Sequence, residues 1–333
     1  MSVDPSESAI VPGIASIGFV GLGNVGAKLA GSVARNGFDL VVHELDRSLV
    51  DGFVAAGAGA ADTPRELAER CDVVITCLPN PAASSVVVEG PDGLLAGWSE
   101  GKIWLEMSTT DETEITRLGG LIAAAGGEPV DCPVSGGCHR AATGNISIFA
   151  GCERSTFERV LPLLSVLGRR VLHTGPLGTA SVLKVATNYL ATANLITLAE
   201  ALTTMAAAGV DLGTTYEAFR ISSGNSFVHE TESQVILNGS RDISFTMDLV
   251  LKDIGLFQSI ADRAGVPLEI NPVMIDIFRD AAERYGDREW SPNVIRRLED
   301  ATGVSVRAPG FPAELVDDEP EAEGAEVIVR TGP

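Results

Sequence analysis

The chain has 333 residues, which corresponds to two domains at the usual size of roughly 150 residues each. Lys and Arg total 24 against 45 Asp and Glu, giving a formal net charge of −21. Such a charge repels polyanions, so nucleic acid and anionic membrane surfaces are not expected partners. Hydrophobic residues make up 45% of the sequence, which excludes a mostly disordered chain.

The cysteines and the N-terminal segment bear on the cellular compartment. Five cysteines, an odd number without paired metal-ligand spacing, predict free thiols rather than a disulfide framework or a zinc site. Residues 1–12 lack the basic and apolar regions of a signal peptide. The apolar stretch 186–210 contains Asn188, Asn194 and Glu200, which predicts a buried helix rather than a membrane span. We therefore expect a cytoplasmic protein that does not enter a membrane.

The first part of the chain alternates short β-branched runs with helical stretches, the pattern of βαβ units in a parallel sheet. Two helix starts are marked by capping boxes, one at Thr63 and Glu66 and one at Asp111 and Glu114. We expect a doubly wound α/β domain over 14–175, after an N-terminal extension over 1–13. The expected strands are 16–20, 40–43, 73–77, 103–106, 128–132, 147–150 and 170–173.

After Gly175 and Pro176 the strand pattern stops and helical periodicities follow. The stretch 179–208 is apolar all round, which predicts a long central helix that leads into an all-helical domain over 176–303. Residues 304–333 form an acidic tail with seven acids and no base between 314 and 326, typical of a solvated, mobile segment. The apolar run 327–329 offers a further strand. The other expected helices are 214–222, 230–237, 246–264, 272–285 and 291–302.

The strongest local motif is a G-x-G-x-x-G loop directly after the first apolar strand. The first glycine permits a tight turn, the second lets the backbone approach a pyrophosphate, and the third lets helix and strand pack closely. In this strand-turn-helix position the motif predicts a Rossmann-type dinucleotide site, the alternative being a glycine-rich corner without ligand. The residues of the loop are Gly21, Leu22, Gly23, Asn24, Val25 and Gly26.

Glu44 ends the second strand, where a carboxylate would accept hydrogen bonds from the adenosine ribose. It therefore favours NAD, because a 2′-phosphate would be repelled. Arg47, three residues later, could bind that phosphate and leaves NADP possible. The alternative for Glu44 is a surface acid at a strand end without a ligand. Leu78 with Pro79, and Thr109, follow two further strands at the edge where doubly wound sheets bind ligands. For Thr109 the alternative is a helix cap.

A Ser-Gly-Gly turn after another strand offers a hydroxyl and backbone N–H groups to a carboxylate, although such a turn is often only a turn. Its residues are Ser135, Gly136 and Gly137. Lys184 and Asn188 are four residues apart, on one face of the expected central helix. A buried lysine there would suit general acid–base chemistry, whereas periodicity alone favours a lysine that reaches solvent. Lys252 beside Asp253 is either a second buried lysine or, by default, part of a solvated charge pair.

Together these segments resemble the β-hydroxyacid dehydrogenase family, to which 3-hydroxyisobutyrate dehydrogenase belongs, over residues 14–303. The resemblance rests on the glycine loop, the segment Asp131 to Gly137, the segment Gly175 to Asn188, and Lys252 with Asp253. It implies a Rossmann domain that binds NAD or NADP, a long interdomain helix, a 6-phosphogluconate dehydrogenase-like helical domain, and a homodimer or tetramer.

The resemblance also implies roles for single residues. The Ser-Gly-Gly turn would hold a substrate carboxylate, Lys184 would exchange the proton of the reacting hydroxyl, and Asn188 would orient substrate and lysine. Leu78, Pro79 and Thr109 match cofactor contacts, and Lys252 would lie near the nicotinamide. Arg140 departs from the family pattern, which commonly has Gly, and would either bind a second polar group of the substrate or point to solvent.

We therefore expect an oxidoreductase that oxidises a small β-hydroxy acid by hydride transfer to NAD, with NADP possible and no metal. A reductase of a semialdehyde, carbonyl or imine substrate is the alternative, because the same residues serve both directions. A non-catalytic nucleotide-binding scaffold is an alternative of another class. Lys184 argues against imine reductases and scaffolds, which commonly lack a lysine at this position.

Overall fold

The computed structural model describes residues 14–330, so the expected extension over 1–13 lies outside the described residues. The chain forms two compact units. Unit 1 ends at Lys184 and resumes at Asp317, whereas unit 2 is Val185–Val316. The division falls inside a long helix rather than at Gly175 and Pro176, and the expected domain limits stay a prediction.

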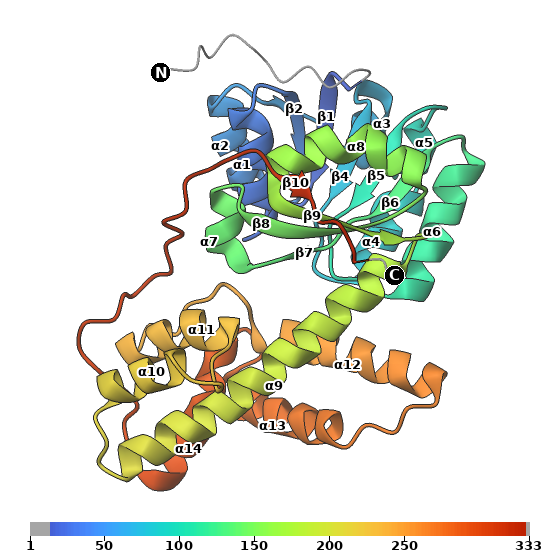
Figure 1. Cartoon of the computed structure of the whole chain (residues 1–333). Coiled ribbons are helices and arrows are strands. Elements are labelled where there is room, and N and C mark those ends of the chain that lie inside the picture. The colour runs from blue at the N-terminus through green and yellow to red at the C-terminus, as the bar shows by residue number, and fades with distance from the viewer. Residues whose placement is uncertain (1–13, 331–333) are drawn as a thin grey trace. The chain divides into compact units, whose positions relative to one another are not determined.

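Among residues 14–330, unit 1 contains one ten-stranded sheet, and its strand order is β10-β9-β8-β6-β5-β4-β1-β2-β3, with β7 paired to β8 (Figure 1). The chain leaves β1 toward β2 on one side and returns to β4 on the other. The sheet therefore has a topological switch point between β1 and β4, where such folds bind their ligands. The strands are β1 (Ser16–Val20), β2 (Asp39–His43), β3 (Gly59–Ala60), β4 (Val73–Thr76), β5 (Ile103–Glu106), β6 (Glu128–Asp131), β7 (Val134–Ser135), β8 (Ile146–Gly151), β9 (Gly168–Gly175) and β10 (Ala325–Glu326).

The first six strands are parallel, as expected, but β8 pairs antiparallel with β6 and β7. The link from β7 to β8 contains only the short helix α7 (Gly137–Ala142), and a return parallel to β7 needs a crossover of about a dozen residues or more. The strands expected at 147–150 and 170–173 therefore exist but run opposite to the first six. The carboxyl ends of β1, β2, β4, β5 and β6 share one edge.

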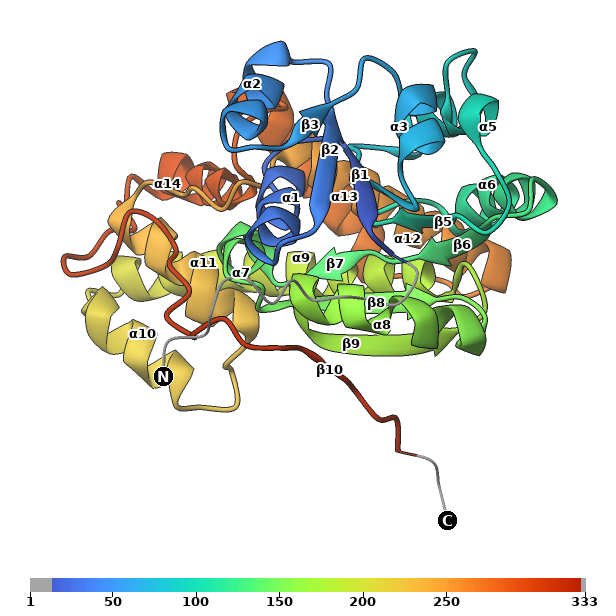
Figure 2. The same cartoon turned by 90° about the horizontal axis from the view of Figure 1, so that it is seen from above.

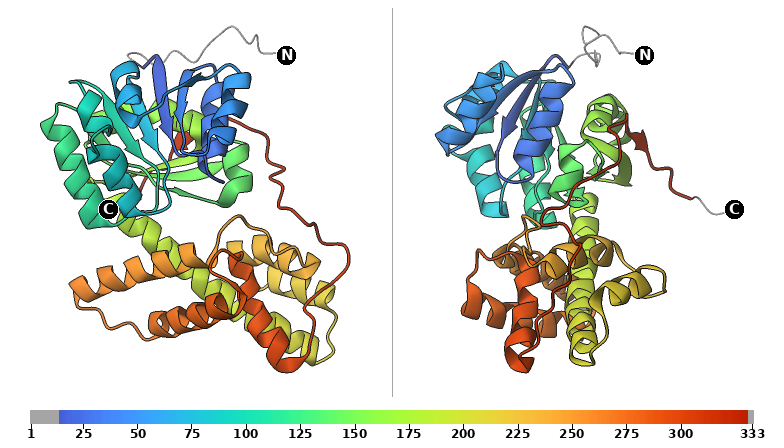
Figure 3. Two further views of the ribbon diagram at one scale, coloured as in Figure 1. Left: turned by 180° about the vertical axis from the view of Figure 1, so that it is seen from behind. Right: turned by 90° about the vertical axis from the view of Figure 1, so that its left-hand side faces the viewer.

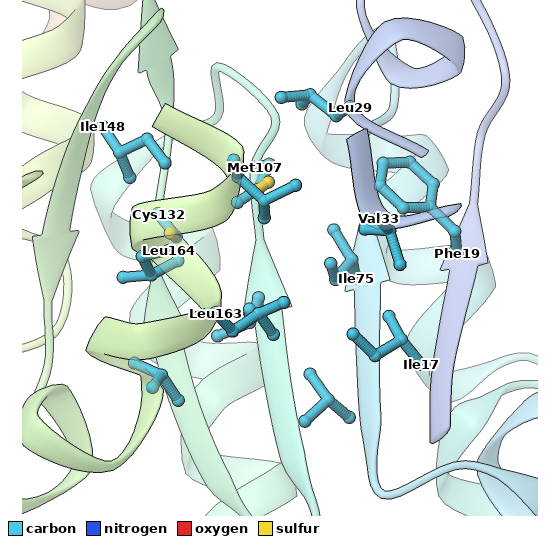
Figure 4. Close-up of a cluster of buried hydrophobic side chains, with 14 of the residues drawn as sticks. Ile17, Phe19, Leu29, Val33, Ile75, Met107, Cys132, Ile148, Leu163 and Leu164 are labelled. Atoms are coloured by element: carbon cyan, nitrogen blue, oxygen red, sulfur yellow. The ribbon is translucent and has the colours of Figure 1, made fainter. Parts of the chain in front are cut away.

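Helices cover both faces of the sheet. One face packs against α1 and α8, through Leu29 and Val33 of α1 and Leu163 and Leu164 of α8 (Figure 4). The other face packs against α3, α4, α5 and α6. Thr63 and Asp111 cap α3 and α6 as the sequence predicts. The helices are α1 (Gly26–Arg35), α2 (Arg47–Ala55), α3 (Pro64–Arg70), α4 (Pro81–Glu89), α5 (Leu94–Gly97), α6 (Glu112–Ala124) and α8 (Arg154–Leu167).

Unit 2 is helical, as the sequence predicts. Its core gathers around the C-terminal part of α9, where Leu195, Leu198 and Leu202 are buried, and α12 packs along α13 (Figure 3). Among residues 14–330, α9 alone is long and apolar enough to span a membrane, a test that the core helix of a soluble protein also passes. The helices are α9 (Thr179–Ala207), α10 (Leu212–Arg220), α11 (Phe227–Asn238), α12 (Met247–Ala264), α13 (Ile270–Tyr285), η1 (Ser291–Ile295) and α14 (Arg296–Thr302).

The segment after α14 contacts both units, in contrast to the solvated tail expected for it. Within unit 2, Val306 is buried and the Phe311 carbonyl accepts a hydrogen bond of 2.8 Å from Asn238 Nδ2. Within unit 1, β10 pairs parallel with the edge strand β9, as Figure 2 shows. Glu326 of β10 forms an ion pair with Arg154 at 2.5 Å. Apolar anchors and arginine partners therefore fix a segment that its acidity alone would leave in solvent.

Candidate functional site

The three glycines of the loop differ in their surroundings: two are closely packed against backbone, and the third has open space around it. Gly21 has φ +95°, and a Cβ on it would lie 2.3 Å from the Cys77 carbonyl oxygen. A Cβ on Gly26 would lie 2.0 Å from the Gly21 carbonyl oxygen. A Cβ on Gly23 would meet nothing within 4 Å. The fold therefore requires Gly21 and Gly26, whereas Gly23 leaves room for a ligand before α1, where helix N–H groups favour an anion.

Glu44 lies beside this loop. Its Oε2 accepts a hydrogen bond of 2.7 Å from the Leu22 N–H, and its Oε1 accepts one of 2.7 Å from the Leu45 N–H. These bonds fix the carboxylate at the end of β2, where an adenosine ribose would lie. Arg47 instead pairs with Asp62 at 2.5 Å, so its charge already has a carboxylate partner.

A buried acid joins the next two loops. Glu106 ends β5 fully buried, and its Oε1 accepts hydrogen bonds from the N–H and hydroxyl of Ser108, the first at 2.9 Å. The Ser108 hydroxyl oxygen accepts 2.7 Å from the Leu78 N–H. Burial raises the pKa of Glu106, and Ser108 opposes that shift. Glu106 thus positions the loops of Leu78 and Thr109, a role that sequence motifs did not reveal.

A second buried acid connects the Ser-Gly-Gly segment with the helix of the proposed catalytic lysine. Asp131 accepts hydrogen bonds from the Ser181 N–H at 2.7 Å and the Ser181 hydroxyl at 2.6 Å. Burial raises the pKa of Asp131 to about 6, and Ser181 opposes that shift. Ser181 lies about one turn before Lys184 on α9. Asp131 therefore fixes the start of α9 against the end of β6.

The Ser-Gly-Gly turn has a backbone that only glycine readily adopts. Gly136 has φ +133° and Gly137 has φ +87°, and half-buried Ser135 precedes them. The side chain of Arg140 is half-buried, so it does not point wholly into solvent. Its Cδ lies 3.4 Å from the position that a Cβ on Gly136 would occupy. The structure thus places Arg140 along the wall of the turn.

Lys184 is buried, with 8% of its surface exposed. This excludes the alternative that periodicity alone favoured, a lysine extending into solvent. Burial of an ammonium group is costly unless it is paired or neutral, so a buried lysine on an apolar helix is a candidate for proton exchange. Asn188 follows four residues later on α9, on the same helix face.

In unit 2, Asp253 of α12 joins Asn188 and Lys252. Its Oδ2 accepts a hydrogen bond of 2.5 Å from Asn188 Nδ2, and its Oδ1 lies 2.9 Å from Lys252 Nζ. Asp253 is only 1% exposed. These two partners compensate the cost of burying its negative charge. Asp253 therefore supports Lys252 and also orients Asn188.

Within residues 14–330, no three His, Cys, Asp or Glu side chains are placed to hold a metal ion. The sequence motifs identified the loops of the site, including the one that contains Ser108, but not the hydrogen bonds by which Glu106 fixes that loop and Asp131 fixes Ser181 of α9. A buried acid at the end of a strand, followed two residues later by serine, is the signal that could have indicated Glu106.

Comparison with known proteins agrees with this arrangement. The sequence model of the NAD binding domain of 6-phosphogluconate dehydrogenase matches residues 16–175, and that of the NAD-binding of NADP-dependent 3-hydroxyisobutyrate dehydrogenase matches 178–298. A 2-(hydroxymethyl)glutarate dehydrogenase of Eubacterium barkeri is 33% identical, over 87% of this chain and 97% of the relative. The chain belongs to the β-hydroxyacid dehydrogenase family.

Two further family members support the assignment. An NAD-dependent L-serine dehydrogenase of Pseudomonas aeruginosa is 35% identical, over 86% of this chain and 98% of the relative. The crystal structure of a 3-hydroxyisobutyrate dehydrogenase from Salmonella typhimurium is 27% identical with a TM-score of 0.78, covering 85% of this chain and 99% of that one. As a member of this family the chain is an NAD(P)-dependent dehydrogenase. The open cradle at Gly23 fits the cofactor, because the turn leaves its backbone accessible.

Proposed function

We propose that the enzyme oxidises the hydroxyl group of a small β-hydroxy acid similar to 3-hydroxyisobutyrate, with NAD as cofactor. The observation that carries the proposal is buried Lys184 on α9, about one turn after Ser181, which Asp131 fixes to the end of β6. A lysine held in this way suits an enzyme better than a nucleotide-binding scaffold, which needs no buried proton donor.

In the proposed mechanism, Ser135 and the N–H groups of Gly136 and Gly137 bind the substrate carboxylate. The neutral Lys184 amine takes the hydroxyl proton at its Nζ while hydride leaves the adjoining carbon. Bound NAD supplies the hydride acceptor. In the reverse direction the Lys184 ammonium returns the proton to the carbonyl oxygen, so the same residues would serve a reductase.

The remaining residues position these groups. Asn188, oriented by Asp253, would donate a hydrogen bond to the reacting oxygen or to Lys184. Lys252 would lie near the nicotinamide and the substrate. Around the cofactor, the proposed contacts are Gly21, Leu22, Gly23, Asn24, Val25, Gly26, Glu44, Leu78, Pro79 and Thr109. NAD is preferred over NADP because the Glu44 carboxylate would repel a 2′-phosphate. We further propose a cytoplasmic homo-oligomer.

The test is a turnover screen with 3-hydroxyisobutyrate, 2-(hydroxymethyl)glutarate and L-serine, using NAD and NADP, on wild type, Lys184→Ala and the nearly isosteric Lys184→Met. We expect wild type to oxidise at least one acid. We expect both variants to lose about 10²–10⁴-fold in kcat while the cofactor Kd, measured by nicotinamide fluorescence, stays within about twofold. Full activity in either variant would contradict the mechanism. Normal cofactor binding without any turnover by wild type would favour the scaffold. Turnover of imines alone, in a parallel screen with NADH and NADPH, would favour the reductase.

A further inference from the structure

The short helix after the Ser-Gly-Gly turn is fixed by the C-terminal segment of the chain. Asp317 Oδ2 accepts hydrogen bonds from Thr143 Oγ1 and from Asn145 Nδ2, the second at 2.8 Å. Asn145 Nδ2 also donates 2.9 Å to the Glu319 carbonyl. Thr143 and Asn145 directly follow α7, so residues 317–319 hold the C-terminal end of that helix. All of these contacts lie within unit 1.

Arg140 connects this end of α7 with the turn. Its carbonyl accepts hydrogen bonds of 2.9 Å from the Asn145 N–H and 3.2 Å from Thr143 Oγ1. Its side chain runs back along Gly136, as the 3.4 Å approach of Cδ shows. The Asp317 carboxylate therefore lies at the same helix end as the backbone of Arg140, whose side chain lines the turn.

The two charges also influence each other. Burial acts to raise the pKa of the Asp317 carboxyl, but hydrogen bonds from Thr143 and Asn145, followed by the Arg140 charge, outweigh it and keep this pKa below the ordinary value. Burial, then the Arg140 charge, lowers the pKa of His139, while Asp317 opposes that shift. At the same end of α7, Arg35 donates a hydrogen bond of 2.9 Å to the Ala142 carbonyl and pairs with Glu321 at 3.4 Å. At neutral pH the negative charges of Asp317 and Glu321 thus balance the positive charges of Arg140 and Arg35. The family models end at residue 298, so Asp317 lies beyond them.

We infer that Asp317 is a specificity-determining residue: it positions α7 and offsets the charge of Arg140, so the site takes a β-hydroxy acid with a single carboxylate and disfavours a second one. The inference rests on the proposed function, because it assumes that the Ser-Gly-Gly turn binds the substrate carboxylate. A second substrate carboxylate near Arg140 would lose its hydration without gaining a net electrostatic attraction, because the charges around Arg140 already balance. Without Asp317, Arg140 would attract it.

The test compares kcat/KM for 2-(hydroxymethyl)glutarate, a dicarboxylate, with that for 3-hydroxyisobutyrate, a monocarboxylate. In Asp317→Asn, which removes the charge with little change in shape, we expect the ratio of dicarboxylate to monocarboxylate to rise about tenfold, mainly through KM. The matched control is Asp318→Asn, the same change at the exposed neighbouring residue, which should leave the ratio unchanged. Adding Arg140→Gln to Asp317→Asn should abolish the gain.

Three results would overturn the inference alone: an unchanged ratio in Asp317→Asn, an equal rise in Asp318→Asn, or a wild type that already prefers the dicarboxylate. Turnover by wild type would leave the proposed function standing in each case. If wild type turns over neither of these two acids, calorimetric titration of the NAD complex with both decides the inference, and the proposed function fails as well only if L-serine is not oxidised either. Asp317→Asn must then bind the dicarboxylate more tightly than wild type does, and any other result overturns the inference.

Discussion

The two units hold their functional residues in different ways. In unit 1, the proposed site residues other than Lys184 lie in or next to turns and loops that follow strands. Two buried acids act through serines: Glu106 fixes the loops of Leu78 and Thr109, and Asp131 fixes the start of α9. In unit 2, Asn188 and Lys252 project from helices and share Asp253. Loops after strands can be recognised from short motifs, whereas side chains on helices acquire their partners only through tertiary packing. The predictions below test whether this difference is real.

The largest effect is expected at Asp253. Asp253→Ala removes the buried carboxylate that holds the half-buried Asn188 amide and the Lys252 ammonium group, which should cost about 3–5 kcal/mol in stability and about 100-fold or more in kcat. Asp262→Asn, at an acid on the exposed side of the same helix, is the control and should change neither. Chemical denaturation and steady-state kinetics measure the two effects. Equal behaviour of the two variants would mean that Asp253 does not organise the unit 2 site.

The raised pKa of Asp131 should be visible in the pH dependence of stability. Its folded pKa of about 6 lies above the ordinary 3.8, so the folded state retains a proton that the unfolded state releases. Stability therefore falls as pH rises from about 4 to about 6, by up to about 3 kcal/mol, and then levels off. Asp131→Asn should lack this fall, although it weakens the bonds to Ser181. Parallel stability curves for wild type and variant would refute the raised pKa.

In unit 2, Glu232 offers the counterpart of Asp131. Its Oε2 is buried without a hydrogen-bond partner among residues 14–330, and burial raises its pKa to about 8. Glu232→Gln should therefore stabilise the protein at pH 9 relative to pH 4, because ionisation of the buried acid opposes folding above its unfolded pKa. Thermal denaturation at both pH values measures this. A variant less stable than wild type at pH 9 would show an ion partner for Glu232.

Substitutions in the glycine loop can distinguish effects on packing from effects on cofactor binding. Gly21→Ala should reduce both stability and NAD affinity, because its Cβ would contact the Cys77 carbonyl. Gly23→Ala should leave the melting temperature nearly unchanged while NAD affinity falls about 10–100-fold, since only a ligand would meet the new methyl group. Gly52→Ala, on α2 with open space around it, is the control. Loss of stability in Gly23→Ala would contradict an open cradle.

The smallest effect is expected at Glu44. Glu44→Gln should raise the affinity for NADP relative to NAD about fivefold to tenfold, because repulsion of the 2′-phosphate disappears. Arg47→Ala should leave that ratio unchanged, since Arg47 already pairs with Asp62. Titration with NADH and NADPH followed by fluorescence gives both ratios. A wild type that binds NADPH much more tightly would show that Glu44 was misinterpreted.

The sequence predicted the fold class because hydrophobic periodicity, capping residues such as Thr63 and the glycine loop are local signals. It did not predict that β8 and β9 run antiparallel to the first six strands, since strand direction depends on how the chain turns after Ser135. Burial of Lys184 was also beyond periodicity, because α9 is apolar on every side and no face is marked. The contacts of Asp317 join residues far apart in sequence, which no local pattern encodes.

The pairing of β10 with β9 has a consequence for synthesis. Unit 1 is discontinuous, so during translation β1 to β9 emerge first, unit 2 follows, and β10 emerges after every other described element. Until then β9 presents an open edge with unpaired backbone groups, which can pair with another chain. The nascent protein therefore passes through a stage at which its sheet can recruit a neighbouring copy. The C-terminal segment ends that stage, and truncation before Ala325 would prolong it indefinitely.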